Sequence, residues 1–432
     1  MAVKPKLALI PSGYKAGKVY SVLPSDGSGD FDNFSRSNQT ATRVNKDGLI
    51  ETVGSNVPRL NYPMIDGVVS GCPSLLLEPA RTNLVTYSED FSESIWTKSG
   101  SSVVSGFISP DGTASAFKLV EDTSTGSHKI YQNIAGTTAN ADYSISFYVK
   151  PNGNDYVTLN PTGLSASNTQ FNLSTKTVAI DNYAGATYSN GKIEELANGW
   201  LRCSATVNEP YGAIYAHIYT SPTTSYLSYT GDGTSGLYIW GAQLELGSYP
   251  TSYIPTNGST ATRSAETCNG AGDATTFNDS EGVLMAEISA LTDIGSNQSI
   301  AISDGSINNR ILFRYNSTNQ IRVIVISNTS FVFDKTLNIS SINEYNKFVI
   351  KYKQDDFALW VNGFELGADN SGVTPTGLNE LALDDGSGVN DFYGNTKQIQ
   401  YFDTALIDSE LETLTSWTSF NEMAISQQYS LY

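Results

Sequence analysis

The feature that most limits the possible folds is a series of short alternating segments separated by Asn-Gly turns. Residues 143–149 and 155–159 each alternate apolar with mostly polar side chains, and Asn152-Gly153 lies between them. A period of two places successive side chains on opposite faces, which is typical of a strand with one buried face. Asn-Gly between two such segments is the strongest short-range signal for a β-hairpin. This part of the chain therefore predicts an antiparallel sandwich.

The same pattern returns in the C-terminal part with different residues. Residues 311–326 contain two apolar segments, and Asn362-Gly363 separates two more within residues 348–366. Only 16% of the residues are charged, whereas the chain contains 37 Gly and 25 Tyr, which suit tight turns and pleated surfaces respectively. We therefore expect an all-β protein, in which an extended N-terminal segment precedes two antiparallel β-sandwich domains. A short helix is expected near the end, at residues 405–417.

The domain boundaries follow from a change of composition within Leu237–Arg263. Its first ten residues are apolar and aromatic, as in a buried strand, and the remainder is rich in Pro, Gly, Ser and Thr, as in a linker. Residues Thr260–Arg263 repeat the letters of Thr40–Arg43, which we interpret as a reused connector. The predicted parts are an N-terminal anchoring or oligomerisation segment (1–90), a first sandwich (91–254), a linker (255–265), a second sandwich (266–420) and a tail (421–432).

The net charge of −18 is concentrated in the C-terminal part of the chain. Residues 1–90 contain nine basic and nine acidic side chains, whereas residues 263–432 contain nine basic and twenty-two acidic ones. An acidic surface repels phosphates, so we expect no binding to nucleic acid. No long apolar segment is present, so we expect no membrane insertion. The neutral N-terminal segment is better suited to contact a protein partner.

The cysteines and the N-terminus indicate synthesis in a reducing cytoplasm. Cys72, Cys203 and Cys268 are odd in number and far apart, which fits neither a disulfide framework nor a metal-binding spacing. Mostly buried, reduced thiols are expected instead. The apolar stretch at residues 7–10 is too short for a secretory signal, so we expect that a protein found outside a cell would leave by lysis.

A cluster of three leucines, Leu75, Leu76 and Leu77, lies between two prolines in an otherwise polar segment. Such a cluster requires an apolar surface to cover it, because exposed apolar patches tend to be interfaces. Two interpretations stay open. The leucines pack on the first sandwich, or they anchor the chain to neighbouring chains or to a larger particle.

A second candidate site is the polar face of the strand predicted at residues 213–219. Strand periodicity places Tyr215, His217 and Tyr219 together on the face opposite the apolar residues. Tyr156, on another predicted strand, is a candidate to join them. Sugar rings stack on aromatic side chains and are oriented by neighbouring polar groups, so the four residues are a glycan-binding hypothesis. The alternative is that this face packs against a sheet, a loop or a subunit. Trp200 and Trp240, by contrast, have apolar neighbours and are expected in the core.

The residues do not favour catalysis. The chain has only two histidines, and no motif indicates an activated serine or cysteine. Glycoside hydrolysis requires a pair of carboxylates at a defined separation, but Glu287 is alone in its predicted strand. We therefore expect a protein that is not an enzyme.

No cofactor is expected, and calcium is the only metal considered. Residues 384–388, Asp-Asp-Gly-Ser-Gly, offer oxygen ligands of the kind that calcium prefers. The alternative is a solvated turn, and no loop has the ligand spacing of a dedicated calcium site.

Three regions resemble known proteins. Residues 348–366 followed by 399–414 resemble the end of concanavalin A-like jelly rolls of the laminin G/pentraxin type. The first sandwich, from Phe91 to Trp240, is similar to carbohydrate-binding-module-like jelly rolls. Residues 11–51 and 72–91 look like a group of bacteriophage virion proteins, fibre or tail-associated, that bear such lectin-like domains.

The resemblance implies a non-enzymatic structural protein on the tail or head of a phage particle, synthesised in the host cytoplasm. The N-terminal segment would contact other virion proteins, and the chain would form a homo-oligomer, with a trimer favoured. Its displayed domains would adhere to host-surface polysaccharide. The alternative is a purely architectural decoration of capsid, neck or tail. A bacterial adhesin is disfavoured, because neither a signal peptide nor a sorting segment is evident.

Overall fold

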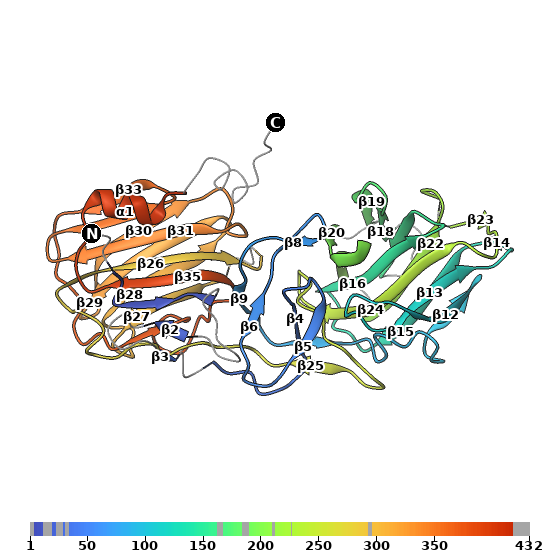
Figure 1. Ribbon diagram of the computed structural model, residues 1–432, viewed down its shortest axis with the longest axis horizontal. Helices are drawn as coiled ribbons and strands as arrows, with labels where there is room; N and C mark the ends of the chain where they lie inside the picture. The colour runs from blue at the N-terminus through green and yellow to red at the C-terminus, as the bar shows by residue number, and fades with distance from the viewer. Residues whose placement is uncertain are drawn as a thin grey trace.

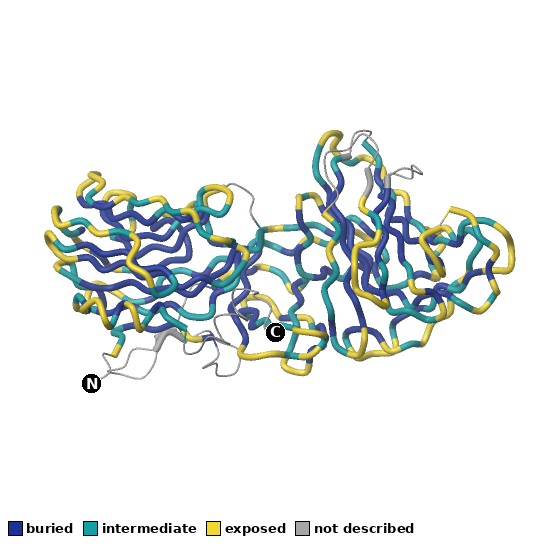
Figure 2. Tube along the Cα trace, turned by 90° about the horizontal axis from the view of Figure 1, so that it is seen from above, coloured by how far each residue is buried: buried dark blue, intermediate teal, exposed yellow. Residues whose placement is uncertain are grey.

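A computed structural model describes residues 4–11, 20–22, 29–30, 34–161, 167–183, 190–209, 212–225, 227–292 and 296–417. Two β-lobes lie side by side along the long axis and are joined by a narrower middle region (Figure 1). Buried strands run through both lobes, and exposed residues gather mainly in the loops (Figure 2). The described residues contain one α-helix, so the all-β prediction is confirmed. None of their helices is long and apolar enough to span a membrane.

The first sandwich consists of two antiparallel six-stranded sheets. The first, here called the outer sheet, has the order β11 (Thr97–Ser99), β15 (His128–Ala135), β22 (Ala213–Ser221), β17 (Tyr156–Leu159), β18 (Ser167–Asn172) and β19 (Thr177–Tyr183). The second, here called the inner sheet, has the order β12 (Ser101–Phe107), β13 (Ala116–Glu121), β24 (Gly236–Leu246), β16 (Ala141–Asn152), β21 (Leu201–Glu209) and β20 (Lys192–Glu195). The short pair β14 (Thr125–Gly126) and β23 (Tyr229–Thr230) lies beside them.

Alternating residues of both sheets build the core between them. In β22, Ile214, Ala216 and Ile218 are fully buried and pack with apolar residues of the inner sheet such as Phe147 and Leu244. This is the partition that the period of two predicts. The side chains between them in β22 therefore face away from the core.

The second sandwich pairs a ten-stranded sheet with a five-stranded one. The ten-stranded sheet has the path β3 (Gly29–Asp30), β2 (Tyr20–Val22), β1 (Leu7–Leu9), β35 (Gly394–Phe402), β26 (Glu281–Ala290), β31 (Asn346–Lys353), β32 (Phe357–Val361) and β33 (Phe364–Asp369), with β9 (Ser74–Leu77) also on β35 and β6 (Arg59–Asn61) on β9. The five-stranded sheet has the order β30 (Ser330–Asn338), β29 (Gln320–Ser327), β28 (Arg310–Ser317), β27 (Gln298–Ser303) and β34 (Glu380–Ala382).

Local signals in this domain are confirmed. Asn362 and Gly363 both have positive φ, 49° and 90°, and connect β32 to β33, as an Asn-Gly hairpin turn requires. The helix α1 (Asp408–Thr415) follows β35 and packs Leu411 against the sheet. Its N-cap position is Ile407, and Glu410 accepts a hydrogen bond from the Ile407 amide.

The N-terminal segment is not a separate extended arm, and both interpretations of its leucine cluster are wrong. Leu75, Leu76 and Leu77 lie in β9, which pairs with β35 of the second sandwich. Leu75 and Leu77 are fully buried in the core of that sandwich, together with Leu7 of β1. The leucines therefore complete a core more than 300 residues away in the chain, and they are not available to anchor it to a neighbour.

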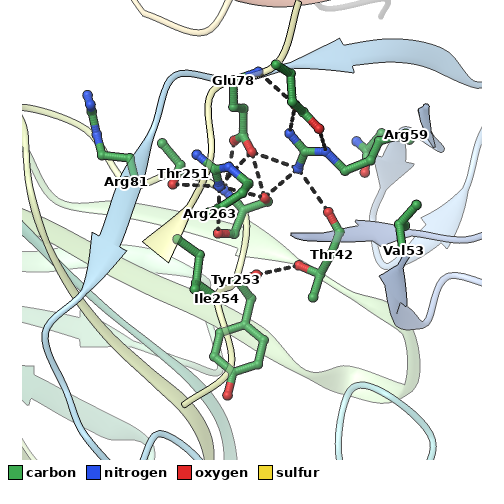
Figure 3. Close-up of polar contacts among 12 residues, drawn as sticks. Thr42, Val53, Arg59, Glu78, Arg81, Thr251, Tyr253, Ile254 and Arg263 are labelled. Carbon is green, nitrogen blue, oxygen red and sulfur yellow. Dashed lines mark hydrogen bonds and ion pairs between the residues drawn. The ribbon is translucent and has the colours of Figure 1, made fainter. Parts of the chain in front are cut away.

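The predicted flexible linker at residues 255–265 is instead tied into a buried ion network in the middle region. The arginines Arg59 of β6 and Arg263 of β25 (Ala261–Arg263) converge on the Glu78 carboxylate (Figure 3). The distances are 2.7 Å from Arg59 Nη1 and 2.9 Å from Arg263 Nη1 to Glu78 Oε2. Glu266 accepts hydrogen bonds from Arg36 Nη1 at 2.7 Å and from Arg59 Nε at 2.8 Å. All five side chains are buried, so these segments hold one another in place.

The remaining short pairs belong to the same middle region. They are β4 (Ala41–Val44) with β5 (Ile50–Val53), β7 (Met64–Ile65) with β8 (Val68–Val69), and β10 (Arg81–Asn83) with β25. Both copies of the repeated tetrapeptide run into strands, β4 and β25, and they meet where Thr40 Oγ1 donates to the Thr262 carbonyl at 2.8 Å. Cys203 and Cys268 are buried free thiols, whereas Cys72 is exposed. The predicted tail, residues 421–432, lies outside the described residues.

Candidate functional site

The structure places the four predicted glycan-binding residues on the outward face of the outer sheet. Residues opposite one another in an antiparallel pair have their side chains on the same face. In that register Tyr131 of β15 lies opposite His217, and Lys129 lies opposite Tyr219. Tyr215 lies two residues before His217 on the same side of β22. The face therefore combines the predicted β22 residues with two residues of β15 that sequence reasoning missed.

Four aromatic rings on this face form one cluster around His217. Its ring centroid lies 4.5 Å from that of Tyr131, 5.0 Å from that of Tyr215 and 5.7 Å from that of Tyr219. The Tyr131 and Tyr219 contacts are edge-to-face, an arrangement that aromatic pairs prefer. Only 4% of the His217 surface is exposed, whereas Tyr131 and Tyr215 are half-buried. The cluster thus has a buried centre and two tyrosine rings that reach solvent.

The His217 ring is polar but has no polar contact. Neither ring nitrogen has a hydrogen-bond partner among the described residues. Burial and the nearby Lys129 charge lower the pKa of His217 to about 3, so the ring is neutral near pH 7 and offers one donor and one acceptor. A buried polar group without a partner costs about 1–3 kcal/mol. A hydroxyl group would satisfy either nitrogen.

Lys129 brings a positive charge to the same cluster. Its Nζ donates to the Tyr219 hydroxyl at 3.2 Å and lies 5.2 Å and 5.0 Å from the ring centroids of Tyr131 and Tyr219. These distances are in the range of cation–π contacts. Burial lowers the pKa of Lys129. The alternation of Lys129 and Tyr131 in the sequence could have marked them as facing one way, but nothing in the sequence shows that β15 pairs with β22.

Polar side chains of β17 and β18 continue the face. Gln170 Nε2 donates to Thr158 Oγ1 at 3.0 Å, and Thr158 lies opposite Tyr219. Gln170 Oε1 and Asn168 Oδ1 are buried acceptors without a partner among the described residues. Tyr156 shares this face one register step away, and its hydroxyl accepts from Asn172 at 3.0 Å. It therefore borders the ring cluster and has no ring contact with it.

The other residues considered in the sequence are engaged in structural contacts. Trp200 and Trp240 are buried, as expected. They pack against the face of the inner sheet that points away from the outer sheet, and not in the core between the two sheets. Glu287 is buried and accepts a hydrogen bond from Gln398 Nε2 at 2.7 Å.

In the acidic loop at residues 384–388 the two carboxylates are buried, whereas Ser387 and Gly388 are exposed. Asp385 is buried, lies 3.1 Å from Arg310 Nη1 and accepts from the Ser387 hydroxyl at 2.7 Å. Asp384 accepts from Asn269 Nδ2 at 2.8 Å. The described residues contain no group of three His, Cys, Asp or Glu side chains placed to hold a metal ion. The loop carboxylates thus have protein donors as partners.

The chain matches no protein-family model and no curated protein sequence. It does align with solved β-sandwich structures over part of its length. The carbohydrate-binding module CBM40 of the Ruminococcus gnavus IT-sialidase aligns at 15% identity and a TM-score of 0.29, over 34% of this chain and 93% of that one. A mutant NanB sialidase from Streptococcus pneumoniae aligns at 16% and 0.29, over 33% and 25%. Sheep galectin-11 aligns at 9% and 0.22, over 28% and 89%. At such values the alignments assign neither a ligand nor an activity to this chain.

Proposed function

We propose that the chain is a non-enzymatic structural protein of a bacteriophage particle, and that its first sandwich adheres to host-surface glycans. The single observation that carries the binding proposal is the outward ring cluster with the unpartnered His217 at its centre. The phage context is supported by the resemblance of residues 11–51 and 72–91 to virion proteins. In this proposal residues 1–90 attach the chain to other virion proteins and support a homo-oligomer, with a trimer favoured.

The geometry suits sugar binding because it combines flat apolar surfaces with unsatisfied polar atoms. The half-exposed rings of Tyr131 and Tyr215 offer stacking surfaces for pyranose C–H groups. The unmet hydrogen bonds of Gln170 Oε1 and of the neutral His217 ring lie just below this surface, so a sugar hydroxyl meets them only where the side chains above them move aside. The face can therefore hold and orient a glycan without any bond being made or broken.

The binding proposal is tested on the full chain with an array of host-surface polysaccharides, followed by calorimetry on the best ligand. Tyr131→Ala and Tyr215→Ala are each expected to weaken binding about tenfold, since one lost stacking contact is worth about 1.4 kcal/mol. Phe331→Ala is the matched control, because Phe331 is an exposed aromatic residue of the second sandwich. Equal losses in all three variants, or no binding to any glycan, would count against this face.

An architectural role without glycan binding is the second candidate. It is favoured by the deep burial of His217 and Tyr219, which shows how much of the face is already packed. A phage that lacks the protein distinguishes the two candidates, because loss of adsorption supports adhesion and loss of particle stability supports architecture. Antibody labelling of purified particles tests the virion location, and light scattering of the purified protein tests the trimer.

A further inference from the structure

We propose that this face selects sugars that carry a carboxylate, and that Lys129 is the residue that determines this specificity. The inference rests on the proposed glycan-binding function and adds the class of sugar. It concerns the charge of the bound sugar, because the aromatic rings alone do not distinguish a charged sugar from a neutral one.

The first step is that Lys129 has no counter-ion among the described residues. The chain contains 43 acidic and 25 basic side chains, and most of its buried or half-buried cations contact a carboxylate. None of the carboxylates among the described residues forms an ion pair with Lys129, whose polar contact is the Tyr219 hydroxyl. Burial is the cause of its lowered pKa, and no nearby acid opposes it. An unpaired, partly desolvated ammonium attracts an anion more strongly than an exposed one does.

The second step is that the charge lies next to the stacking surface. The ammonium is 5.2 Å from the centroid of the Tyr131 ring, and His217, which contacts the same ring, is neutral at pH 7 because burial lowers its pKa to about 3. Lys129 therefore supplies the formal charge of the ring cluster. A pyranose bound beside Tyr131 therefore brings its ring substituents, a carboxylate among them, close to the ammonium that lies over that ring.

The third step separates a sugar acid from a simple polyanion. The chain as a whole has a net charge of −18, which disfavours long polyanions such as nucleic acid. A sugar with a single carboxylate brings one negative charge to Lys129 of β15 and is repelled less by the rest of the chain than a polyanion is.

The experiment uses the full chain and matched ligand pairs that differ only in charge. Oligosaccharides of galacturonate, glucuronate and N-acetylneuraminate are titrated calorimetrically beside their methyl esters. For at least one pair the acid is expected to bind at least tenfold more tightly than the ester. Added salt is expected to weaken the binding of the acid and not that of the ester. Lys129→Gln should lower the affinity for the acid to that for the ester.

Two further variants keep the outcome interpretable. Lys129→Arg retains the charge and is expected to restore the preference for the acid. Lys118→Gln is the matched control, since Lys118 lies in the inner sheet and donates to the Thr234 carbonyl at 2.7 Å. Equal affinity for acid and ester, or an acid preference that survives Lys129→Gln, overturns this inference and leaves the proposed function standing. Absence of binding to any glycan overturns both.

Discussion

The two outward faces of the first sandwich are both aromatic, yet they differ in what lies against them. On the inner sheet, Tyr148 and Trp240 are covered by Ile50 of the N-terminal segment and by Tyr253, which lies just before the predicted linker. The Trp240 indole is satisfied there, because its Nε1 donates to Ser115 Oγ at 2.9 Å. On the outer sheet the rings of Tyr131 and Tyr215 keep exposed surface, and His217 has no hydrogen-bond partner among the described residues.

The difference teaches that aromatic content alone does not identify a binding face. On the covered face the apolar area is buried, although Arg202 Nε and Ser204 Oγ also have no hydrogen-bond partner there among the described residues. A face that leaves buried polar atoms unpaired gives up stability, and such costs tend to persist at functional sites. The residues that cover the inner sheet, Ile50 and Tyr253, are held in place in turn by the ion network of the middle region.

The largest expected effect comes from breaking that network. Glu266→Gln leaves Arg36 and Arg59 buried without the Glu266 charge, and removal of one partner of a buried ion pair typically costs about 3–5 kcal/mol. Urea unfolding of the full chain measures the change. Glu51→Gln is the matched control, because its pair with Arg43 is half-exposed and should contribute about 1 kcal/mol or less. Equal, small losses in both variants would show that the network does not hold the cover.

A direct contrast of the two faces follows from truncating one aromatic residue on each. Trp240→Ala is expected to reduce the free energy of unfolding by about 3–5 kcal/mol, because a fully buried ring leaves a cavity. Tyr215→Ala should cost only about 1 kcal/mol, since the ring is half-exposed. Thermal and urea unfolding measure both. A larger loss for Tyr215→Ala would mean that the outer face is structural.

Acid should weaken the ion network of the middle region through Glu78. Arg263 and Arg59 hold the pKa of Glu78 at about 2, below its ordinary value of 4.5. A carboxyl group whose pKa is lowered in the folded state stabilises the fold above its unfolded pKa and loses that contribution as pH falls through the folded pKa. A shift of this size corresponds to roughly 3 kcal/mol, lost between about pH 4.5 and pH 2. Glu78→Gln should flatten the pH dependence in urea unfolding, and an unchanged profile would contradict this.

Structural features that depend on residues near one another in the chain were predictable from the sequence. Features that depend on pairing between distant strands were not. Alternation and Asn362-Gly363 were sufficient to predict strands and a hairpin, because those signals are local. The burial of Leu75 against β35 was not predictable, since the pairing joins residues more than 300 positions apart. For the same reason the site prediction found Tyr215 but missed Lys129, which reaches the cluster only through the register of two strands.

The central claim is that the outer face accepts a cost in stability in order to bind a ligand, and the substitution His217→Phe tests it most directly. Phenylalanine retains a ring in the cluster and removes the two unpartnered nitrogens. His128→Phe is the matched control, because both ring nitrogens of His128 lie against carbonyl oxygens, Nδ1 at 2.5 Å from that of Gly100 and Nε2 at 3.3 Å from that of Tyr229. We expect His128→Phe to destabilise the chain by about 1–3 kcal/mol.

The decisive measurement is the free energy of unfolding of His217→Phe, taken beside its affinity for the glycan that the wild-type chain binds. The account predicts that stability is unchanged or rises by up to about 1 kcal/mol, while binding falls at least tenfold. A variant that loses stability as His128→Phe does, and still binds the glycan as wild type, would contradict the account.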